Sequence, residues 1–212
     1  MKKMLIVRPA YDIGSNYLYL WSQEVIDFAV KKDWLVEKSD KEKATKQEFE
    51  SRIKNKPDFV FINGHGGPDV VFGHARTPLV DLSNCALLKD TITFTRACNC
   101  IQKLGKKAVA EGCTAFIGYW REFWVPRLHA YESTPLGDPL AKPVMEVSNA
   151  IPTAIIKGHT VEEAFNSSTT IAEKHLLKLI TSKEQYDRAI LRAMLNNTTA
   201  LSYEGDKLAK IE

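Results

Sequence analysis

Three short apolar runs between Phe59 and Tyr119 constrain the fold of this chain most strongly, and each run ends in residues whose side chains could take part in binding or catalysis. FVFI leads into the turn from Asn63 to Gly67, ITFT leads into Arg96-Ala97-Cys98, and TAFIG leads into Tyr119-Trp120. Continuous apolar runs of this length are typical of strands buried on both faces of a parallel sheet. Open α/β sheets bind ligands in the crevice outside the carboxyl ends of such strands. We therefore expect His65 and Cys98 to lie side by side at that edge.

The rest of the chain alternates between strand-like and helix-like stretches. Six strands are expected, at residues 3–7, 34–36, 59–62, 91–95, 114–118 and 198–203. Helical spacing of apolar residues predicts helices at 18–29, 41–56, 101–109, 143–157, 161–179 and 185–195, with Thr160 and Glu163 as a capping box and Pro152 as a break or bend. This alternation indicates a three-layer α/β sandwich, a mostly parallel six-stranded doubly wound sheet with helices on both faces.

Two segments show neither the apolar spacing of a helix nor that of a strand. Residues 66–90 contain two prolines and three glycines, and we expect a long loop or a short excursion there. Loops of that length inside a domain are usually functional. Residues 120–143 are rich in aromatic residues and proline and predict a wall beside the crevice. The chain has no internal repeat and no linker, which predicts a single domain over residues 1–212.

Composition and charge exclude several classes of function. The net charge of +3 is spread in runs of mixed sign, which are typical of solvated helix surfaces and not of a nucleic-acid-binding stripe. Four cysteines in a chain of 212 residues predict reduced thiols in a reducing compartment. The apolar run MLIV is too short for a signal peptide, and no segment approaches the roughly 20 apolar residues of a membrane span. We expect a soluble, cytoplasmic protein that binds neither nucleic acid nor membrane.

His65 and Cys98 together predict nucleophilic chemistry. A cysteine becomes a good nucleophile beside a base, and a histidine titrating near neutrality can be that base and later the acid. Gly66 allows the backbone to come close, which leaves its amide free to donate to an oxyanion, with the Cys98 amide as a second donor. The structural alternative is an idle histidine in a turn and a buried cysteine that ends a strand.

Other pairings of the same residue types remain open. Cys100 competes with Cys98 for the nucleophile's position, although it would fall in the first turn of the next helix. Asp69 in the following loop is a candidate for orienting His65. A zinc site built from His65, His74, Cys98 and Cys100 would match none of the usual ligand spacings, so no metal and no cofactor are predicted.

An apolar strand followed by His-Gly, and a second followed by Ala-Cys, resembles the caspase-like cysteine peptidases of clan CD. The phrases FVFINGHGGPDVVFG, TFTRACNC and CTAFIGYW resemble the gingipain and CHAT branches of that group more than caspases, over about residues 58 to 120. The resemblance implies a caspase-like fold with a dyad of His65 and Cys98 and with Gly66 as an oxyanion donor. Asn99-Cys100 departs from the caspase pattern, and the interval of 33 residues between His65 and Cys98 is shorter than in caspases.

The resemblance also implies a specificity pocket built from the end of the first strand and from residues 119–124. Asp12 there would select a basic residue of the substrate, Arg8 would select an acidic one, and Trp120 would be a stacking wall. The resulting hypothesis is a cysteine endopeptidase that hydrolyses peptide or protein substrates after a basic residue. The alternative is a catalytically silent caspase-like scaffold that binds a protein partner.

Overall fold

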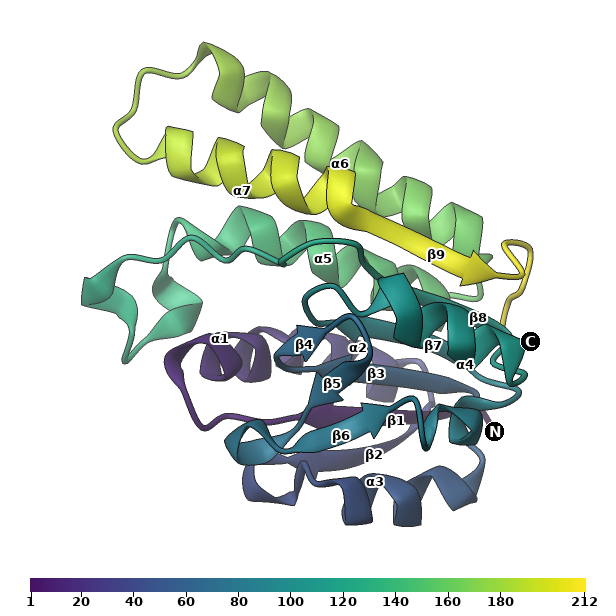
Figure 1. The fold of residues 1–212 in the computed structure, drawn as a ribbon. Coiled ribbons are helices and arrows are strands. Elements are labelled where there is room, and N and C mark those ends of the chain that lie inside the picture. The colour runs from purple at the N-terminus through teal and green to yellow at the C-terminus, as the bar shows by residue number, and fades with distance from the viewer.

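A mixed six-stranded sheet forms the centre of the molecule in the computed structural model, which describes residues 1–212 (Figure 1). The strand order is β2-β1-β3-β7-β8-β9. The first five of these are parallel to their neighbours, and β9 runs antiparallel to β8. Their bounds are β1 Lys3–Arg8, β2 Leu35–Asp40, β3 Phe59–Asn63, β7 Ile92–Arg96, β8 Ala115–Tyr119 and β9 Leu201–Gly205. The prediction of a mostly parallel six-stranded α/β sheet is confirmed.

Helices cover both faces of the sheet because successive strand residues point to opposite sides. Met4 and Ile6 of β1 pack in a cluster with α2 (Gln23–Lys31), α5 (Ala141–Ile156) and the start of α6 (Val161–Thr181). Leu5 and Val7 pack on the other side, in a cluster with α3 (Lys46–Arg52) and α4 (Lys106–Ala110). The three layers predicted from the sequence are therefore present. No helix has the length and apolar character that crossing a bilayer would require.

Residues 66–90 form a short excursion from the main sheet, the second of the two expected alternatives, and not a long loop. They form a small antiparallel sheet of β4 (Gly66–Gly67), β5 (Val70–Phe72) and β6 (Pro78–Asp81), in the order β4-β5-β6. Val71 and Val80 are fully buried against the α3 and α4 side of the main sheet. The strands were missed because each is only two to four residues long, too short for a period to be visible.

Several helix boundaries also differ from the expected ones. The apolar residues predicted to form one helix at 18–29 belong to two helices, α1 (Ile13–Trp21) and α2. The helix predicted at 41–56 is shorter and corresponds to α3. Helix α5 continues through Pro152, while α6 begins with the predicted capping box on Thr160. Helix α7 (Asp187–Ala200) runs past Leu195 because Asn197 exchanges hydrogen bonds of 2.8 Å with the backbone N–H and C=O of Trp124. The last strand consequently begins at Leu201 instead of Thr198.

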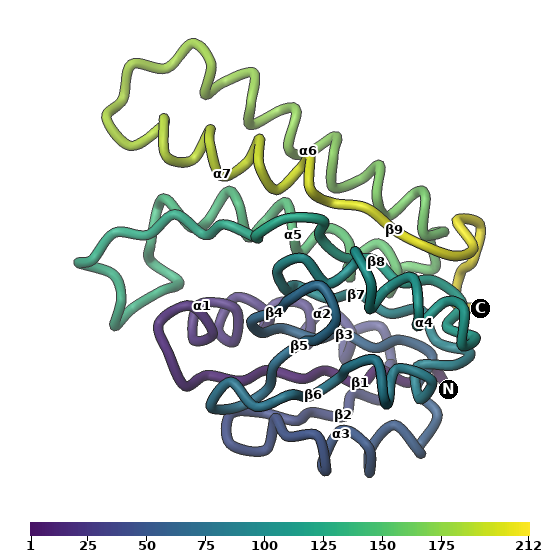
Figure 2. Tube along the Cα trace, viewed as in Figure 1, coloured from purple at the N-terminus to yellow at the C-terminus, as the bar shows by residue number.

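The segment from residue 120 to 140 has no regular structure beyond short turns, as its composition predicts. Figure 2 shows it leaving β8, running along α5 and turning back into that helix. Phe123 and Leu128 pack against the hydrophobic cluster that includes Val144 and Val147 of α5, which fixes the segment in place. It stands beside the carboxyl ends of β3 and β7, where the site lies.

Candidate active site

His65 follows the end of β3 and is held by an acidic partner. Its Nε2 lies 2.7 Å from Oδ2 of Asp12, and each of these side chains is a little over one third exposed (37% and 39%). Asp12 is the N-cap of α1 and accepts a hydrogen bond of 2.7 Å from the backbone N–H of Ser15. A side chain fixed by the helix terminus thus fixes the imidazole. The orienting group is Asp12, whereas Asp69, considered from the sequence, is exposed.

Asp12 remains ionised at neutral pH. Partial burial opposes its charge, but the hydrogen bonds from Ser15 and the contact with His65 outweigh that effect, so the pKa of Asp12 lies below its usual value. An ionised carboxylate accepts the N–H of the imidazole at Nε2, which leaves Nδ1 unprotonated in the neutral ring.

Cys98 lies just beyond the end of β7 and is the one cysteine of the chain that is not fully buried. Its sulfur accepts a hydrogen bond of 3.4 Å from the backbone N–H of Phe123. Burial raises the pKa of the Cys98 thiol, the bond from Phe123 lowers it, and the charge of Glu122 adds to the increase, with a net rise above the ordinary value. The resting thiol is therefore neutral at pH 7 and needs a base when it attacks.

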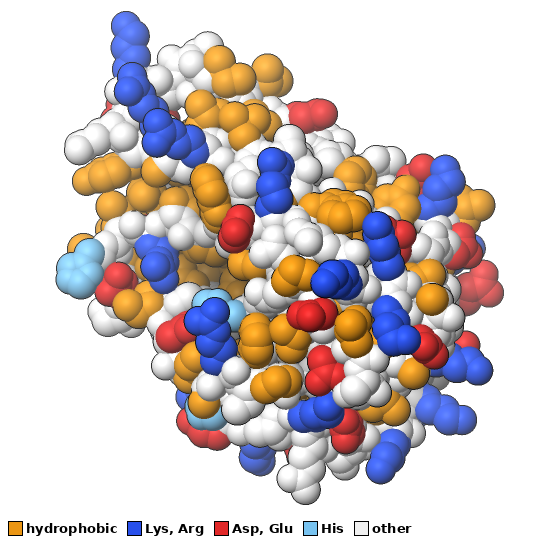
Figure 3. Space-filling view, viewed as in Figure 1, with side chains coloured by type: hydrophobic (Ala, Val, Ile, Leu, Met, Phe, Trp, Pro, Cys, Tyr) orange, Lys and Arg blue, Asp and Glu red, His pale blue; other side chains and the backbone are white.

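One pocket of about 290 Å³ joins the two side chains. Its lining residues come from α1, the ends of β3 and β7, and the 120–140 segment: Gly14, Leu18, Gly64, His65, Arg96, Ala97, Cys98, Phe123, Trp124, Val125 and Arg127. His65 and Cys98 both line it without a hydrogen bond between them. The space-filling view shows a hollow with hydrophobic walls, and charges of both signs interspersed over the same face (Figure 3).

Gly66 brings the histidine turn against the cysteine backbone. A Cβ at Gly66 would lie 2.5 Å from the carbonyl oxygen of Cys98 and 3.0 Å from its nitrogen. The Phe72 amide donates to the carbonyl of His65 at 2.9 Å, and Gly66 is opposite Val71 in the next pair. Because antiparallel pairs alternate between bonded and non-bonded types, the Gly66 N–H points away from β5. That amide is therefore available to an acceptor on the other side.

We expect Gly66→Ala to be far more damaging than Gly67→Ala. The methyl group at residue 66 would displace the Cys98 backbone, and a displacement of about 1 Å at a reacting group is enough to cost roughly a hundredfold in rate. A Cβ at Gly67 meets nothing nearer than Val70 Cγ1 at 3.5 Å, an ordinary contact. Rates of Cys98 alkylation and melting temperatures of the two variants measure this. Equal behaviour of the two would show that the close approach is unimportant.

The remaining sequence-predicted specificity residues lie elsewhere. Arg8 is buried and forms a two-pronged ion pair with Asp40, with nitrogen–oxygen distances of 2.6 and 2.8 Å. Trp120 is one third exposed and carries the Lys106 ammonium 4.8 Å from the centre of its ring. Neither residue lines the pocket, whereas Phe123 and Trp124 of the same predicted segment do.

Cys100 is unsuited to nucleophilic attack. It is fully buried, its sulfur lies 2.8 Å from Thr95 Oγ1, and burial raises the pKa of its thiol to about 11. The neighbouring Cys98 therefore has the accessible sulfur. No three side chains of His, Cys, Asp or Glu come together in a way that could hold a metal ion.

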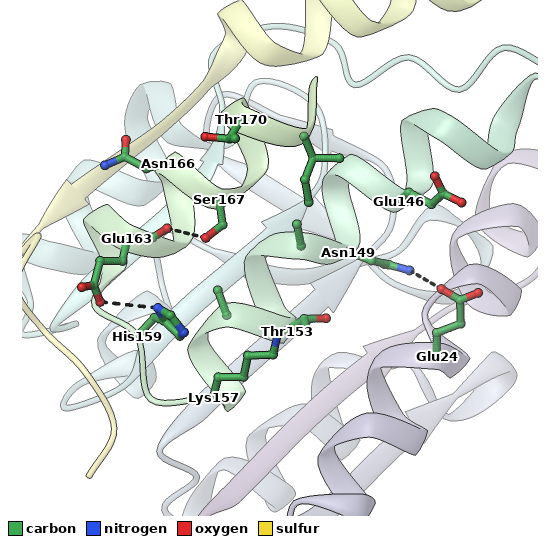
Figure 4. A pocket seen from close by; sticks show the side chains of 13 residues that line it. Glu24, Glu146, Asn149, Thr153, Lys157, His159, Glu163, Asn166, Ser167 and Thr170 are labelled. Carbon is green, nitrogen blue, oxygen red and sulfur yellow. Dashed lines mark hydrogen bonds and ion pairs between the residues drawn. The ribbon is translucent and has the colours of Figure 1, made fainter. Parts of the chain in front are cut away.

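A larger hollow of about 710 Å³ lies between α2, α5 and α6 (Figure 4). It is lined mainly by polar residues, among them Asn149, which donates to Glu24, and His159, which lies 3.7 Å from Glu163. No cysteine lines it. The smaller pocket is therefore the candidate active site.

Two lining residues, Arg96 and Arg127, were not singled out from the sequence. Arg96 ends an apolar strand next to Ala97-Cys98. A charged residue at the end of a buried strand can be recognised in the sequence and could have been predicted to lie near the site. Arg127 lies in the irregular segment, where no period predicts which side chains point inward.

The fold is that of the caspase-like cysteine proteinases. The crystal structure of the Arg-specific cysteine proteinase gingipain R (RgpB) matches with a TM-score of 0.62 and 11% identity, covering 97% of this chain and 46% of that one. The complex of the pro- and mature domains of Porphyromonas gingivalis RgpB matches with a TM-score of 0.57 and 11% identity, covering 97% and 47%. This chain thus spans about half the length of the gingipain chains. No family model and no curated protein matches its sequence.

Proposed function

We propose that this protein is a cysteine endopeptidase with Cys98 as nucleophile and His65 as acid and base, within a single peptidase domain. The observation that carries the proposal is the pocket of about 290 Å³ lined by both side chains at the carboxyl edge of the sheet. The caspase-like fold supports it, since the fold is shared with gingipain R.

The chemistry begins with a neutral thiol. Nδ1 of His65 takes the proton from Cys98 as the sulfur attacks the scissile carbonyl carbon, and the amides of Gly66 and Cys98 donate to the oxyanion. His65 then gives the proton to the leaving amine, the C–N bond breaks and a thioester remains. Water attacks the thioester with His65 as base, the C–S bond breaks, and the thiol regains its proton.

We assign Asp12 to positioning. Its carboxylate contacts His65 Nε2 at 2.7 Å and does not line the pocket, which argues against its use for selecting a basic residue. By holding the proton on Nε2, Asp12 presents Nδ1 as the base and stabilises the imidazolium that forms during attack.

A peptide library incubated with the purified protein tests the proposal, with mass spectrometry to identify the cleaved bonds. We expect cleavage that is absent in Cys98→Ala. If no peptide is cut by protein whose Cys98 thiol is reduced and alkylatable, the silent scaffold that binds a protein partner is the better description.

A further inference from the structure

The Cys98 sulfur receives one hydrogen bond, and its donor is a backbone amide. The N–H of Phe123 donates to Sγ at 3.4 Å from the segment that follows β8. Burial raises the pKa of the Cys98 thiol, and the bond from Phe123 lowers it, because a donor stabilises the ionised sulfur. The thiolate is the reactive form of a cysteine. The direction in which this single N–H points therefore affects the reactivity of Cys98.

The peptide group that carries this N–H is held from its other side by helix α7. The carbonyl of Glu122 belongs to the same peptide group, and in a trans peptide the C=O and the N–H point in opposite directions. Asn196 Nδ2 donates to that carbonyl oxygen at 2.7 Å. A donor fixed on the carbonyl side thus directs the N–H of Phe123 toward Cys98. Hydrogen bonds in a chain also polarise one another, so the bond from Asn196 makes this amide a stronger donor.

Asn197 holds the two peptide groups that follow. It is 5% exposed, its Oδ1 accepts the N–H of Trp124 at 2.8 Å, and its Nδ2 donates to the C=O of Trp124 at 2.8 Å. The sheet brings these segments together, because Tyr119 at the end of β8 is paired with Leu201 at the start of β9. The last turn of α7 therefore lies beside the chain that leaves β8 (Figure 1).

The charged and titratable groups near the Cys98 sulfur do not bond to either asparagine. These groups are His65, Arg96, Cys100, Glu122 and Arg127. Asn196 and Asn197 bond to each other at 3.2 Å and otherwise to backbone atoms of residues 122 and 124. Any effect of the two side chains on the thiol must therefore pass through the backbone of the 122–124 segment.

We propose that Asn196 and Asn197 are positioning residues of the active site, which orient the Phe123 amide toward Sγ and so stabilise the thiolate of Cys98. The proposal rests on the proposed function, in which that sulfur attacks a peptide carbonyl. It makes the last turn of α7 part of the active site, although no residue of α7 lines the pocket. It also gives a reason for two adjacent asparagines inside a helix, where this residue type is unfavourable.

The rate of Cys98 alkylation by iodoacetamide, followed from pH 6 to pH 10 with mass spectrometry to identify the labelled cysteine, tests the proposal without turnover. We expect Asn196→Ala to lower the rate at pH 7.5 by about threefold to tenfold, the factor that one hydrogen bond is typically worth. The difference should narrow as the pH rises, because the thiol then ionises in both proteins. A purely structural defect would change the rate by the same factor at every pH.

Asn197→Ala should change the pH profile in the same direction, with a larger loss of melting temperature because its side chain is buried. Ser168→Ala is the matched control. Ser168 is a buried residue of α6 whose hydroxyl donates to the carbonyl of Val147 at 2.9 Å, away from the 122–124 backbone. Its loss should lower the melting temperature and leave the pH profile of Cys98 alkylation unchanged.

A backbone substitution assigns the effect to the amide. Phenyllactic acid in place of Phe123 keeps the ring and replaces the N–H with an ester oxygen. This protein should show the same slow alkylation as Asn196→Ala, and adding Asn196→Ala to it should cause no further loss.

The outcomes separate the two proposals. A pH profile in Asn196→Ala that matches wild type, a decrease that is equal at every pH, or a further decrease in the ester protein would each overturn the positioning role, even in a protein that cleaves peptides. The expected change of profile in a protein that cleaves no peptide would refute the peptidase function and leave the positioning role standing.

Discussion

Replacing Cys98 with alanine should abolish peptide hydrolysis, with a loss of up to about a millionfold, which leaves only the acceleration due to binding and oxyanion stabilisation. The side chain is small and only partly buried, so the melting temperature should change little. Initial rates on a cleaved library peptide measure the effect.

Cys100→Ala is the matched control, two residues along the chain. Removing its buried sulfur should cost about 1 kcal/mol of the free energy of unfolding, because a small cavity is left between Thr95 and Gly118. Hydrolysis should persist. Loss of activity in Cys100→Ala with retention in Cys98→Ala would reverse the assignment of the nucleophile.

His65→Ala should lower the rate of hydrolysis by about a hundredfold to ten-thousandfold, the range typical for removal of an acid–base group. The thiol of Cys98 is neutral at pH 7 because burial raises its pKa, so attack without the base is slow. His129→Ala is the control, since His129 is 96% exposed and lies outside the pocket. If His65→Ala retained the wild-type rate, another base would be required.

Asp12→Ala should fall between wild type and His65→Ala, because the imidazole stays but loses its fixed tautomer. The folded-state pKa of Asp12 is lowered, so the stability that its ionised form contributes is present above the unfolded value near 3.9 and is lost as the pH falls through the folded value. The pairing with His65 therefore persists throughout the neutral range, and acid inactivation through Asp12 should appear only below about pH 4.

The parallel sheet and the position of His65 and Cys98 at its carboxyl edge were predictable, because buried parallel strands leave long apolar runs and their ends share one edge; the strand order was not predicted. The small sheet within residues 66–90 was not predictable. Its strands are too short to show an alternating pattern, and they are stabilised by the burial of Val71 and Val80. Helix α7 was underestimated for a similar reason. Asn196 and Asn197 favour turns by themselves, but their amides bond to the backbone of residues 122 and 124.

The partners of charged residues were also beyond sequence reasoning. Arg8 and Asp12 lie close together in the chain and were both assigned to substrate, yet Asp40 pairs with Arg8 and His65 pairs with Asp12. Arg96 has the opposite property: it is charged, buried and lacks an acidic partner. Only coordinates show which of these three charged residues has an oppositely charged partner and which has none.

The most direct test of the central claim is the pH dependence of alkylation by iodoacetamide, mapped to individual cysteines in the folded protein. We expect Cys98 to be labelled far faster than Cys85, Cys100 or Cys113, with a rate that still rises above pH 8.5, the ordinary cysteine pKa, and with slower labelling at pH 7.5 in His65→Ala. Labelling of Cys98 at the same rate with and without His65, or preferential labelling of another cysteine, would contradict the account.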